Sequence, residues 1–183
     1  MRDAGGRRAV SSTGCRWPAA IPNSGEFPVW TQQGRTEQGG TETMPGPHFD
    51  ADGWDKKTYA PFCLGDMRGR PRDDETPPFH LMFYDWKWLF ATYDADLDAE
   101  GFIDGCYMNG PNVEGLVRAV RFASGRYPDE SGMITNSEGD TCIVQFGELD
   151  EAVHVAELAA EMIKDRQKLL AAIAIARDRG FED

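Results

Sequence analysis

The C-terminal segment, residues 148–180, constrains the fold of this chain most strongly. Its first part, ELDEAVHVAELAAEMIKD, places apolar side chains at helical spacing, with acids in the first turn and Lys164 in the last, which complements the helix dipole. After Asp165, a good helix-capping residue, RQKLLAAIAIARDRG repeats the pattern and stops at Gly180. The sequence therefore predicts two consecutive C-terminal helices, each with one face to bury.

A third helix is predicted at residues 111–125, PNVEGLVRAVRFASG, where valine and leucine recur at helical spacing. Asn112 would cap this helix and Gly125 would end it. Arg118 and Arg121 lie opposite the apolar stripe in this pattern, so we expect both side chains in solvent.

Runs rich in β-branched and aromatic residues predict the strands. Residues 133–135 and 141–146 flank a polar turn, and Cys142, Val144 and Phe146 would share one face of the second strand. Cys142 reads as a small core residue, because no His or Asp stands at a recognisable catalytic spacing from it.

The aromatic stretch FHLMFYDWKWLFATY, residues 79–93, alternates on both sides of Asp85-Trp86-Lys87 and predicts a β-hairpin with its turn there. A further short strand is expected near residues 59–64. The predicted elements follow one another as a hairpin, a strand, a helix, a second hairpin and a pair of helices. This order predicts an α+β fold in which helices pack on one side of a small antiparallel sheet.

Residues 1–43 have a different composition from the rest of the chain. They are rich in Gly, Ser, Thr, Gln and Pro and show neither a helical nor a strand period. Such a segment buries too little apolar surface to offset its chain entropy. We expect a disordered tail or, because Met44 offers a second start, an untranslated leader, followed by one domain at residues 44–183.

The charge of the chain is strongly negative, with a formal net charge of −12. Coulomb repulsion opposes binding to nucleic acid or to an anionic membrane, so neither is an expected partner. The sequence contains no export signal and no apolar run of the ~18 residues that a membrane span requires. Four scattered Cys and three single His predict no zinc site, and we expect a cytoplasmic protein with reduced thiols and no cofactor.

Residues 94–107, DADLDAEGFIDGCY, look like a calcium loop. An EF-hand needs a bidentate Glu at its last position and a helix on each side. In the best register, which begins at Asp96, Tyr107 takes that last position, and the upstream flank reads as a strand. We therefore interpret the segment as an acidic connection into a short strand that ends in a tight turn at Asn109-Gly110, and keep a calcium-binding regulatory module as an alternative.

Catalytic motifs are missing from the sequence: it has no Gly-rich phosphate loop, HExxH, GxSxG or paired Cys. The many carboxylates could form an acid–base pair, but no spacing selects one. We expect a protein that is not an enzyme, with a small enzyme carrying an acidic pocket as a rival interpretation.

Two stretches carry a family resemblance: EGFIDGCYMNGPNVEGLVRAVRFA and, after it, ITNSEGDTCIVQFGELDEAVHVAELAAEMIKDRQKLLAAIAIA. Together they resemble immunity protein family 51 of bacterial polymorphic toxin systems. The resemblance covers about residues 79–181 and rests on the order of an acidic strand, the Asn109-Gly110 pair, an amphipathic helix, a short strand after Glu138 and two close helices. It departs from the family at residues 111–113, Pro-Asn-Val, where the family often carries Trp. The resemblance implies a protein that binds and neutralises a toxin made by the same bacterium.

An inhibitor of this kind needs a complementary surface with a few aromatic anchors and a charged margin. An acidic domain suits a toxin with a basic active-site surface, such as a nuclease, and an acidic mimic of nucleic acid is an alternative. A second acidic cluster comprises Asp73, Asp74 and Glu75. The candidate partner-binding residues are Asp94, Asp96, Asp98, Glu100, Asp104, Trp86 and Trp88.

Overall fold

The computed structural model describes residues 46–71, 75–126 and 132–181, so the predicted tail at 1–43 lies outside the described residues. In chain order the elements are β1 (Trp54–Asp55), β2 (Cys63–Asp66), β3 (Phe79–Phe83), α1 (Trp86–Thr92), β4 (Phe102–Ile103), β5 (Cys106–Tyr107), α2 (Gly110–Ala123), β6 (Met133–Thr135), β7 (Cys142–Phe146), α3 (Leu149–Lys164) and α4 (Arg166–Arg179).

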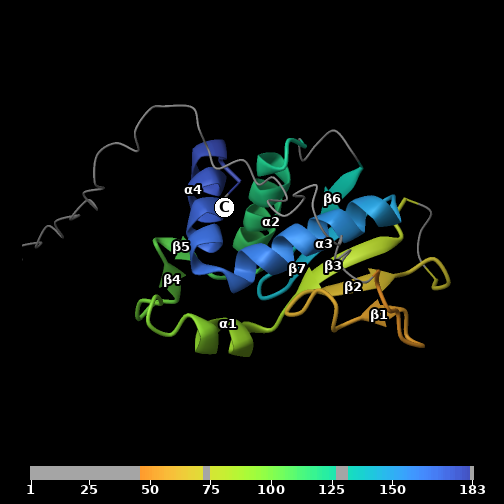
Figure 1. Cartoon of the computed structure of the whole chain (residues 1–183), viewed down its shortest axis with the longest axis horizontal. Coiled ribbons are helices and arrows are strands. Elements are labelled where there is room, and N and C mark those ends of the chain that lie inside the picture. Colours follow the sequence, from red (N-terminus) through yellow and green to blue (C-terminus); the bar gives the residue numbers. More distant parts are fainter. Residues whose placement is uncertain (1–45, 72–74, 127–131, 182–183) are drawn as a thin grey trace, which may run out of the picture.

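Five strands form one antiparallel sheet in the order β1-β2-β3-β7-β6, and β4 pairs with β5 in a separate two-stranded ribbon. Helices α2 and α3 pack against the sheet and against each other, and α4 packs on both (Figure 1). The predicted α+β class is therefore confirmed, with an antiparallel sheet, helices packed on it and a C-terminal helix pair.

Strand alternation decides which side chains enter the core. Phe79, Leu81 and Phe83 of β3 are at most 4% exposed, whereas the residues between them are only half-buried. The same alternation buries Cys142, Val144 and Phe146 of β7, which confirms their predicted common face. Burial raises the pKa of the Cys142 thiol far above its usual range, so this residue is a neutral core side chain.

The predicted helix pair is confirmed in its bounds and its caps. The Asp165 carboxylate accepts hydrogen bonds from the backbone N–H groups of Gln167 and Lys168 and so caps α4. Gly180 ends α4 in the left-handed conformation, with φ of 66°. The apolar faces of α3 and α4 pack against each other and against α2.

Helix α2 begins earlier than predicted. Asn109, not Asn112, is the N-cap: its Oδ1 accepts a hydrogen bond from Asn112 N at 2.9 Å. The expected tight turn at Asn109-Gly110 is also wrong, because Asn109 is extended, with φ of −137°. Gly125 follows the helix with φ of 87°, as its predicted role as terminator requires.

The expected solvent position of Arg121 is wrong. Its side chain is 0% exposed, and its Nε lies 2.8 Å from Glu151 Oε1 on α3. Arg126 contacts the same carboxylate, and Arg118 lies half-buried with its guanidinium 4.5 Å from the ring centre of Phe181. The reason is that α2 contacts β7, α3 and α4 together, which leaves this helix no broad solvated face.

Two predictions for the first half of the domain need correction. The second strand of the expected hairpin at 79–93 is instead helix α1, and the strand expected near 59–64 runs from Cys63 to Asp66. Tyr59 and Phe62 precede that strand in a loop, yet both are fully buried. Their aromatic character therefore marked core residues rather than a strand.

Candidate partner-binding site

Helix α1 starts because Asp85 caps it. The Asp85 Oδ1 accepts a hydrogen bond from Trp88 N at 3.1 Å, and Leu89 N donates to Asp85 O at 3.1 Å, which closes the first turn. Trp86, Leu89 and Tyr93 then fall at helical spacing on the side that faces the core. This local capping overrides the strand preference of the aromatic residues.

The two predicted tryptophan anchors are half-buried and support the fold as well as the surface. The Trp86 ring packs edge-on against Phe83 with centroids 5.0 Å apart, and its indole N–H donates to the Asp140 carbonyl oxygen. Trp88 packs against the core from the same helix. Their contacts with the core hold both rings in fixed positions beside the solvent.

The chain after α1 carries five candidate carboxylates, which we call the acidic rim. Its members are Asp94, Asp96, Asp98, Glu100 and Asp104. The rim starts from a fixed point, because the buried hydroxyl of Tyr93 donates to the Ile163 carbonyl oxygen of α3 at 2.7 Å. The backbone N–H groups of Asp96 and Leu97 return to Tyr93 O at 2.8 and 3.0 Å, which makes a tight turn directly after the helix.

Asp98 and Asp96 organise the rim in different ways. The Asp98 carboxylate accepts hydrogen bonds from the backbone N–H groups of Glu100 and Phe102, both at 2.9 Å, and so shapes the turn before β4. Asp96 Oδ1 lies 2.6 Å from the guanidinium of Arg166 at the start of α4. This hydrogen bond and the charge of Arg166 hold the pKa of Asp96 below its usual value.

Asp104 lies in the two-residue turn between β4 and β5. Asp104 and Gly105 have φ of 49° and 76°, and Ile103 pairs with Cys106, which is the geometry of a tight hairpin turn. Arg177 of α4 donates to the Asp104 carbonyl oxygen at 2.8 Å, so the ribbon is held against the last helix. The side chains of Asp94, Asp98, Glu100 and Asp104 are exposed.

The predicted residues follow one another along one continuous stretch of the chain. Residues 85–114 hold seven acids and one Lys, and α1 with its two tryptophans leads directly into the rim. The rim is tied to the helical layer at Tyr93, Arg166 and Arg177. Asp73 and Asp74 of the second acidic cluster lie outside the described residues, and Glu75 is exposed.

A strand was expected before the acidic segment 94–107, but helix α1 precedes it, as a calcium-binding loop of the EF-hand type would require on that side. The downstream flank is the β4–β5 ribbon instead of a second helix. Within the residues that the structure describes, no group of three or more His, Cys, Asp or Glu is placed to hold a metal ion. Asp98 and Asp96 are instead engaged by backbone N–H groups and by Arg166.

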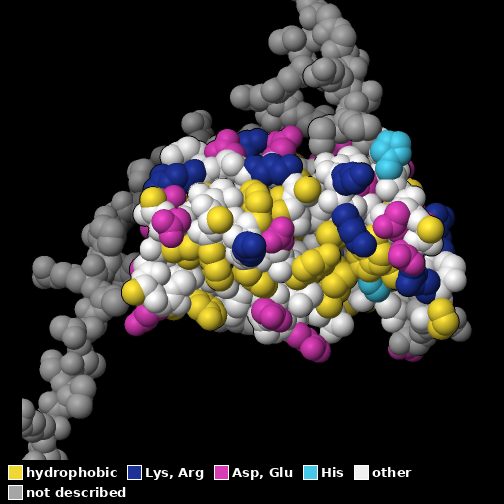
Figure 2. Space-filling model, turned by 90° about the horizontal axis from the view of Figure 1, so that it is seen from below, with side chains coloured by type: hydrophobic (Ala, Val, Ile, Leu, Met, Phe, Trp, Pro, Cys, Tyr) yellow, Lys and Arg dark blue, Asp and Glu magenta, His cyan; other side chains and the backbone are white. Residues whose placement is uncertain are grey.

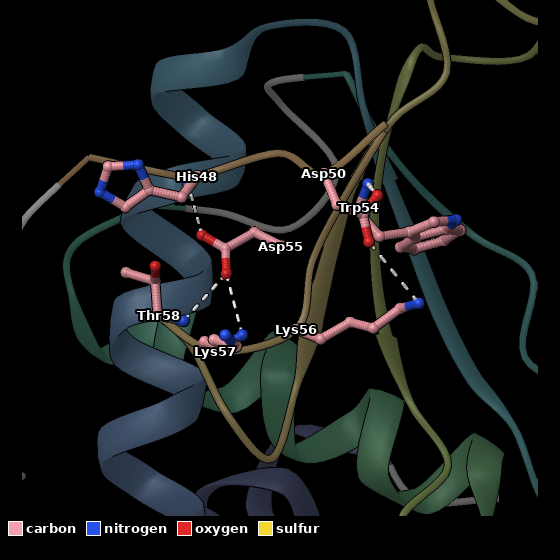
Figure 3. A pocket seen from close by; sticks show the side chains of 7 residues that line it. All are labelled: His48, Asp50, Trp54, Asp55, Lys56, Lys57 and Thr58. Atoms are coloured by element: carbon pink, nitrogen blue, oxygen red, sulfur yellow. Dashed lines mark hydrogen bonds and ion pairs between the residues drawn. The ribbon is translucent and has the colours of Figure 1, made fainter. Parts of the chain in front are cut away.

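A pocket of about 540 Å³ lies beside β1 (Figure 3). Asp55 dominates it: its carboxylate accepts hydrogen bonds from the backbone N–H groups of His48, Lys57 and Thr58 at 2.7 to 2.9 Å. Burial raises the pKa of Asp55, but the hydrogen bonds from Thr58 and its neighbours outweigh burial and hold that pKa below its usual value. This carboxylate shapes the loop around it and has little capacity left for a ligand.

Sequence reasoning missed two exposed aromatic residues next to the tryptophans. Tyr84 is 50% exposed and Phe90 is 41% exposed, the first just before α1 and the second on it. In the view that presents α1 and β1 to the reader, hydrophobic side chains gather in a band across the middle of the surface (Figure 2). The aromatic composition of 79–93 was visible in the sequence, but the residues that reach solvent depend on the helix that was not predicted.

Comparison with known protein families, with curated proteins and with solved structures found no match. Across the described ranges, none of the helices combines the length and the apolar character needed to cross a membrane.

Proposed function

We propose that this chain is an immunity protein, which binds a toxin made by the same bacterium and blocks it by protein–protein contact. The observation that carries the proposal is the acidic rim, five carboxylates in eleven residues directly after a helix that presents two fixed tryptophans. An acidic margin beside rigid aromatic anchors suits a partner with a basic surface, such as the active-site cleft of a nuclease. The resemblance to immunity protein family 51 agrees with this function.

The rim is suited to binding because its backbone is already ordered before a partner arrives. Arg166 and Arg177 hold it from one side, and the Asp98 turn and the β4–β5 ribbon fix its course. A preordered surface loses less conformational entropy on association than a flexible loop. Charged groups at the margin of an interface chiefly raise the association rate, since they steer an oppositely charged partner.

A growth assay tests the proposal. The product of the gene next to that of this chain is expressed in a bacterial host, alone and with the full chain. We expect the neighbour to stop growth alone and to be harmless with this chain. A toxic neighbour that remains toxic at full expression of this chain, or a neighbour with no toxicity, contradicts the immunity function.

A charge-reversal series then tests the rim. Asp94→Lys and Glu100→Lys should slow association with the toxin and flatten its salt dependence, because both side chains are exposed on the rim. Asp150→Lys is the matched control, because Asp150 is also exposed but lies in the first turn of α3. It is about 20 Å along that helix from Ile163, whose carbonyl oxygen accepts the hydrogen bond from Tyr93. Equal effects at all three positions would show that net charge, not the rim, drives binding.

A further inference from the structure

Two arginines of α4 lie on the same side of that helix. Arg166 and Arg177 are separated by three helical turns and about 20° of rotation, so their side chains leave α4 in nearly the same direction, about 16 Å apart along its axis. Between them on this side stand Leu170, which packs against the core, and Ile173, which is fully buried. This side of α4 therefore has an apolar centre with a guanidinium at each end.

Both guanidiniums contact the chain that carries the acidic rim, whose β4–β5 ribbon lies beside α4 (Figure 1). Arg166 places Nε 2.8 Å and Nη2 2.6 Å from Oδ1 of Asp96, the second member of the rim. Arg177 Nη2 donates to the carbonyl oxygen of Asp104, the last member, at 2.8 Å. Helix α4 thus holds the rim near its beginning and at its end.

The position of Arg166 conflicts with the local preference of a helix. Arg166 is the first residue of α4, and beyond the cap at Asp165 the first turn holds no acid. A cation there is unfavourable, because the N-terminus of a helix carries partial positive charge. Their hydrogen bond and opposite charges lower the pKa of Asp96 and raise that of Arg166, which offsets the conflict. A residue that breaks a local rule in favour of one distant contact is expected at a functional surface.

The chain between the two arginine contacts is ordered by its own backbone. Leu97 pairs with Ile103 in an isolated antiparallel bridge, and the Asp98 carboxylate closes the turn between them. The inner side of the ribbon, Ile103 and Cys106, is 1% and 2% exposed and belongs to the core. The segment is therefore a small folded unit, which α4 fixes from outside.

These contacts divide the five carboxylates of the rim into two sets. Asp96 and Asp98 use their carboxylates within the chain, the first on Arg166 and the second on backbone N–H groups. Asp94, Glu100 and Asp104 are exposed, and in its contact with Arg177 Asp104 offers its carbonyl oxygen instead of its carboxylate. The first set shapes the rim, and the second set presents negative charge to solvent.

We propose that Arg166 and Arg177 are positioning residues of the toxin-binding surface. Together with Asp96 and Asp98, they hold the rim in the shape in which the carboxylates of the second set meet Lys and Arg side chains of the toxin. This inference rests on the proposed immunity function and adds which rim carboxylates contact the toxin and which hold the rim in place. Asp96, expected from the sequence to bind the partner, becomes an internal anchor.

Charge and position predict opposite effects when one of these arginines is removed. Loss of Arg166 makes the rim more negative, and on charge alone this speeds association with a basic toxin and tightens the complex. If Arg166 positions the rim, its loss frees the segment, and the toxin then has to order it at a cost in conformational entropy. The direction in which affinity changes therefore decides between the two accounts.

Surface plasmon resonance of the full chain on the purified product of the neighbouring gene measures that direction. Arg166→Met and Arg177→Met keep the length of the side chain but remove its donors, and each should raise Kd about fivefold through faster dissociation. Arg166→Lys retains the charge without the paired nitrogen contact, so its Kd should fall between those of Arg166→Met and the unsubstituted chain.

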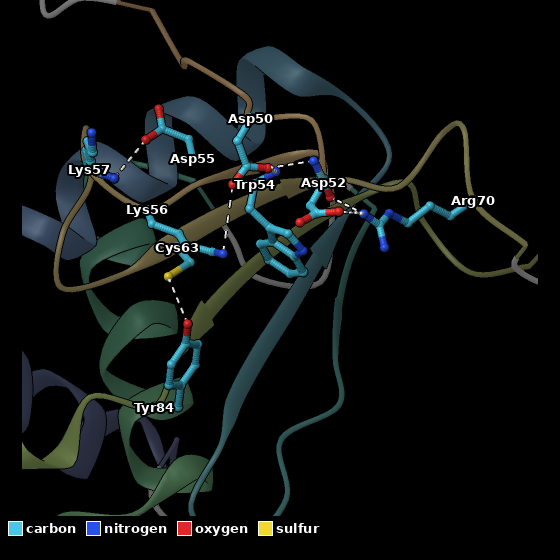
Figure 4. A network of polar contacts seen from close by, with 9 residues as sticks. All are labelled: Asp50, Asp52, Trp54, Asp55, Lys56, Lys57, Cys63, Arg70 and Tyr84. Atoms are coloured by element: carbon cyan, nitrogen blue, oxygen red, sulfur yellow. Dashed lines mark hydrogen bonds and ion pairs between the residues drawn. The ribbon is translucent and has the colours of Figure 1, made fainter.

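Arg70→Met is the matched control. Arg70 is also an exposed arginine that contacts an aspartate in a turn, with Nη2 3.7 Å from Asp52 Oδ1 (Figure 4). It lies beside β1 and β2, at the end of the domain away from the β4–β5 ribbon in Figure 1. The control removes the same charge without touching the rim, and its Kd should stay within about twofold of that of the unsubstituted chain.

Hydrogen exchange of the chain alone tests the positioning role without the toxin. The backbone N–H groups of Asp96 and Leu97 donate to Tyr93 O in the turn that Arg166 holds. They should exchange at least about threefold faster in Arg166→Met and at an unchanged rate in Arg70→Met. Adding Asp96→Asn to Arg166→Met should change neither exchange nor Kd further, because the two residues act as a pair.

The outcomes separate the two proposals. Failure of the unsubstituted chain to bind the toxin overturns the immunity function itself. If the unsubstituted chain binds, and Arg166→Met and Arg177→Met bind as tightly as Arg70→Met or more tightly, the positioning role is wrong while the immunity function stands. Unchanged exchange of Asp96 and Leu97 in Arg166→Met overturns the positioning role as well.

Discussion

Gly110 is the residue at which a single methyl group should disturb the fold most clearly. A Cβ built there would lie 2.5, 2.6 and 2.9 Å from the O, C and N atoms of Thr141, all of them backbone. The same close approach lets Gly110 N donate to the Gly139 carbonyl oxygen at 2.9 Å. This contact ties the start of α2 to the β6–β7 turn, which Trp86 also holds from α1.

The expected cost of Gly110→Ala follows from three effects. Overpacking against backbone that cannot rotate away costs about 1–3 kcal/mol. Displacement of the turn weakens the hydrogen bond to Gly139, which is worth about 1 kcal/mol. The higher helix propensity of Ala returns at most ~1 kcal/mol, and less here because Gly110 precedes Pro111, which disfavours helical backbone for a residue with a Cβ. The net free energy of unfolding should fall by about 2 kcal/mol.

Thermal and urea denaturation followed by circular dichroism measure this change. Gly110→Ala should lower the Tm by roughly 6 °C and the urea midpoint without changing the m-value. Gly147→Ala is the control, because nothing lies within 4 Å of its Cβ position, and its effect should stay within about 0.5 kcal/mol. If the two variants are equally stable, the close packing of Gly110 on Thr141 is not a determinant of the fold.

Three further predictions concern ionisable residues of α3. Glu151→Ala should destabilise the fold by about 3 kcal/mol in urea denaturation, more than Arg126→Ala, because it leaves the buried Arg121 charge without its carboxylate. Burial, with Arg126 and Arg121 nearby, lowers the pKa of His154 below its ordinary 6.5, so its contribution to stability is present above that pH and is lost as pH falls below it. A comparison of Tm between about pH 7.5 and about pH 5 should show a smaller decline for His154→Gln than for the unsubstituted chain, and equal slopes would contradict the assignment. Burial, and after it the charge of Glu161, raises the pKa of Glu157 in the folded state above its ordinary 4.5. The stability that Glu157 contributes is therefore present below pH 4.5 and is lost as the pH rises through its higher pKa in the folded state. Glu157→Gln should therefore raise the Tm at neutral pH.

The elements with a single clear period could be predicted from the sequence. Helices α3 and α4 have apolar stripes, a cap at Asp165 and a terminator at Gly180, and all these local signals agree. Strand β7 follows the alternation of Cys142, Val144 and Phe146. The α+β class follows from these elements because their order allows few arrangements.

Helix α1 could not be read from the sequence because nearly every residue around it is apolar. A run such as WKWLFATY satisfies both a strand period and a helical period, and propensity then favours the strand. The deciding fact is the Asp85 side chain, which caps the first turn. An Asp before an ambiguous aromatic run was the available signal, as was Asp104-Gly105 for the β4–β5 turn.

Helical spacing also could not predict the environment of the charged residue Arg121. Arg121 follows Val117 by four residues and so lies at the edge of the apolar stripe of α2, where helical spacing alone does not decide between solvent and core. Its burial depends on α3 bringing Glu151 to the same place from thirty residues away. The sheet is similar: alternation shows which residues share one of its faces, but only the tertiary packing of α2 and α3 shows which face the helices leave uncovered.

Binding between the purified full chain and the purified product of the neighbouring gene tests the central claim most directly. Isothermal titration calorimetry at physiological salt should give a saturable complex with a Kd below about 1 μM, and the toxin in that complex should lose its activity. No heat of binding, together with undiminished toxin activity at excess of this chain, would contradict the immunity function.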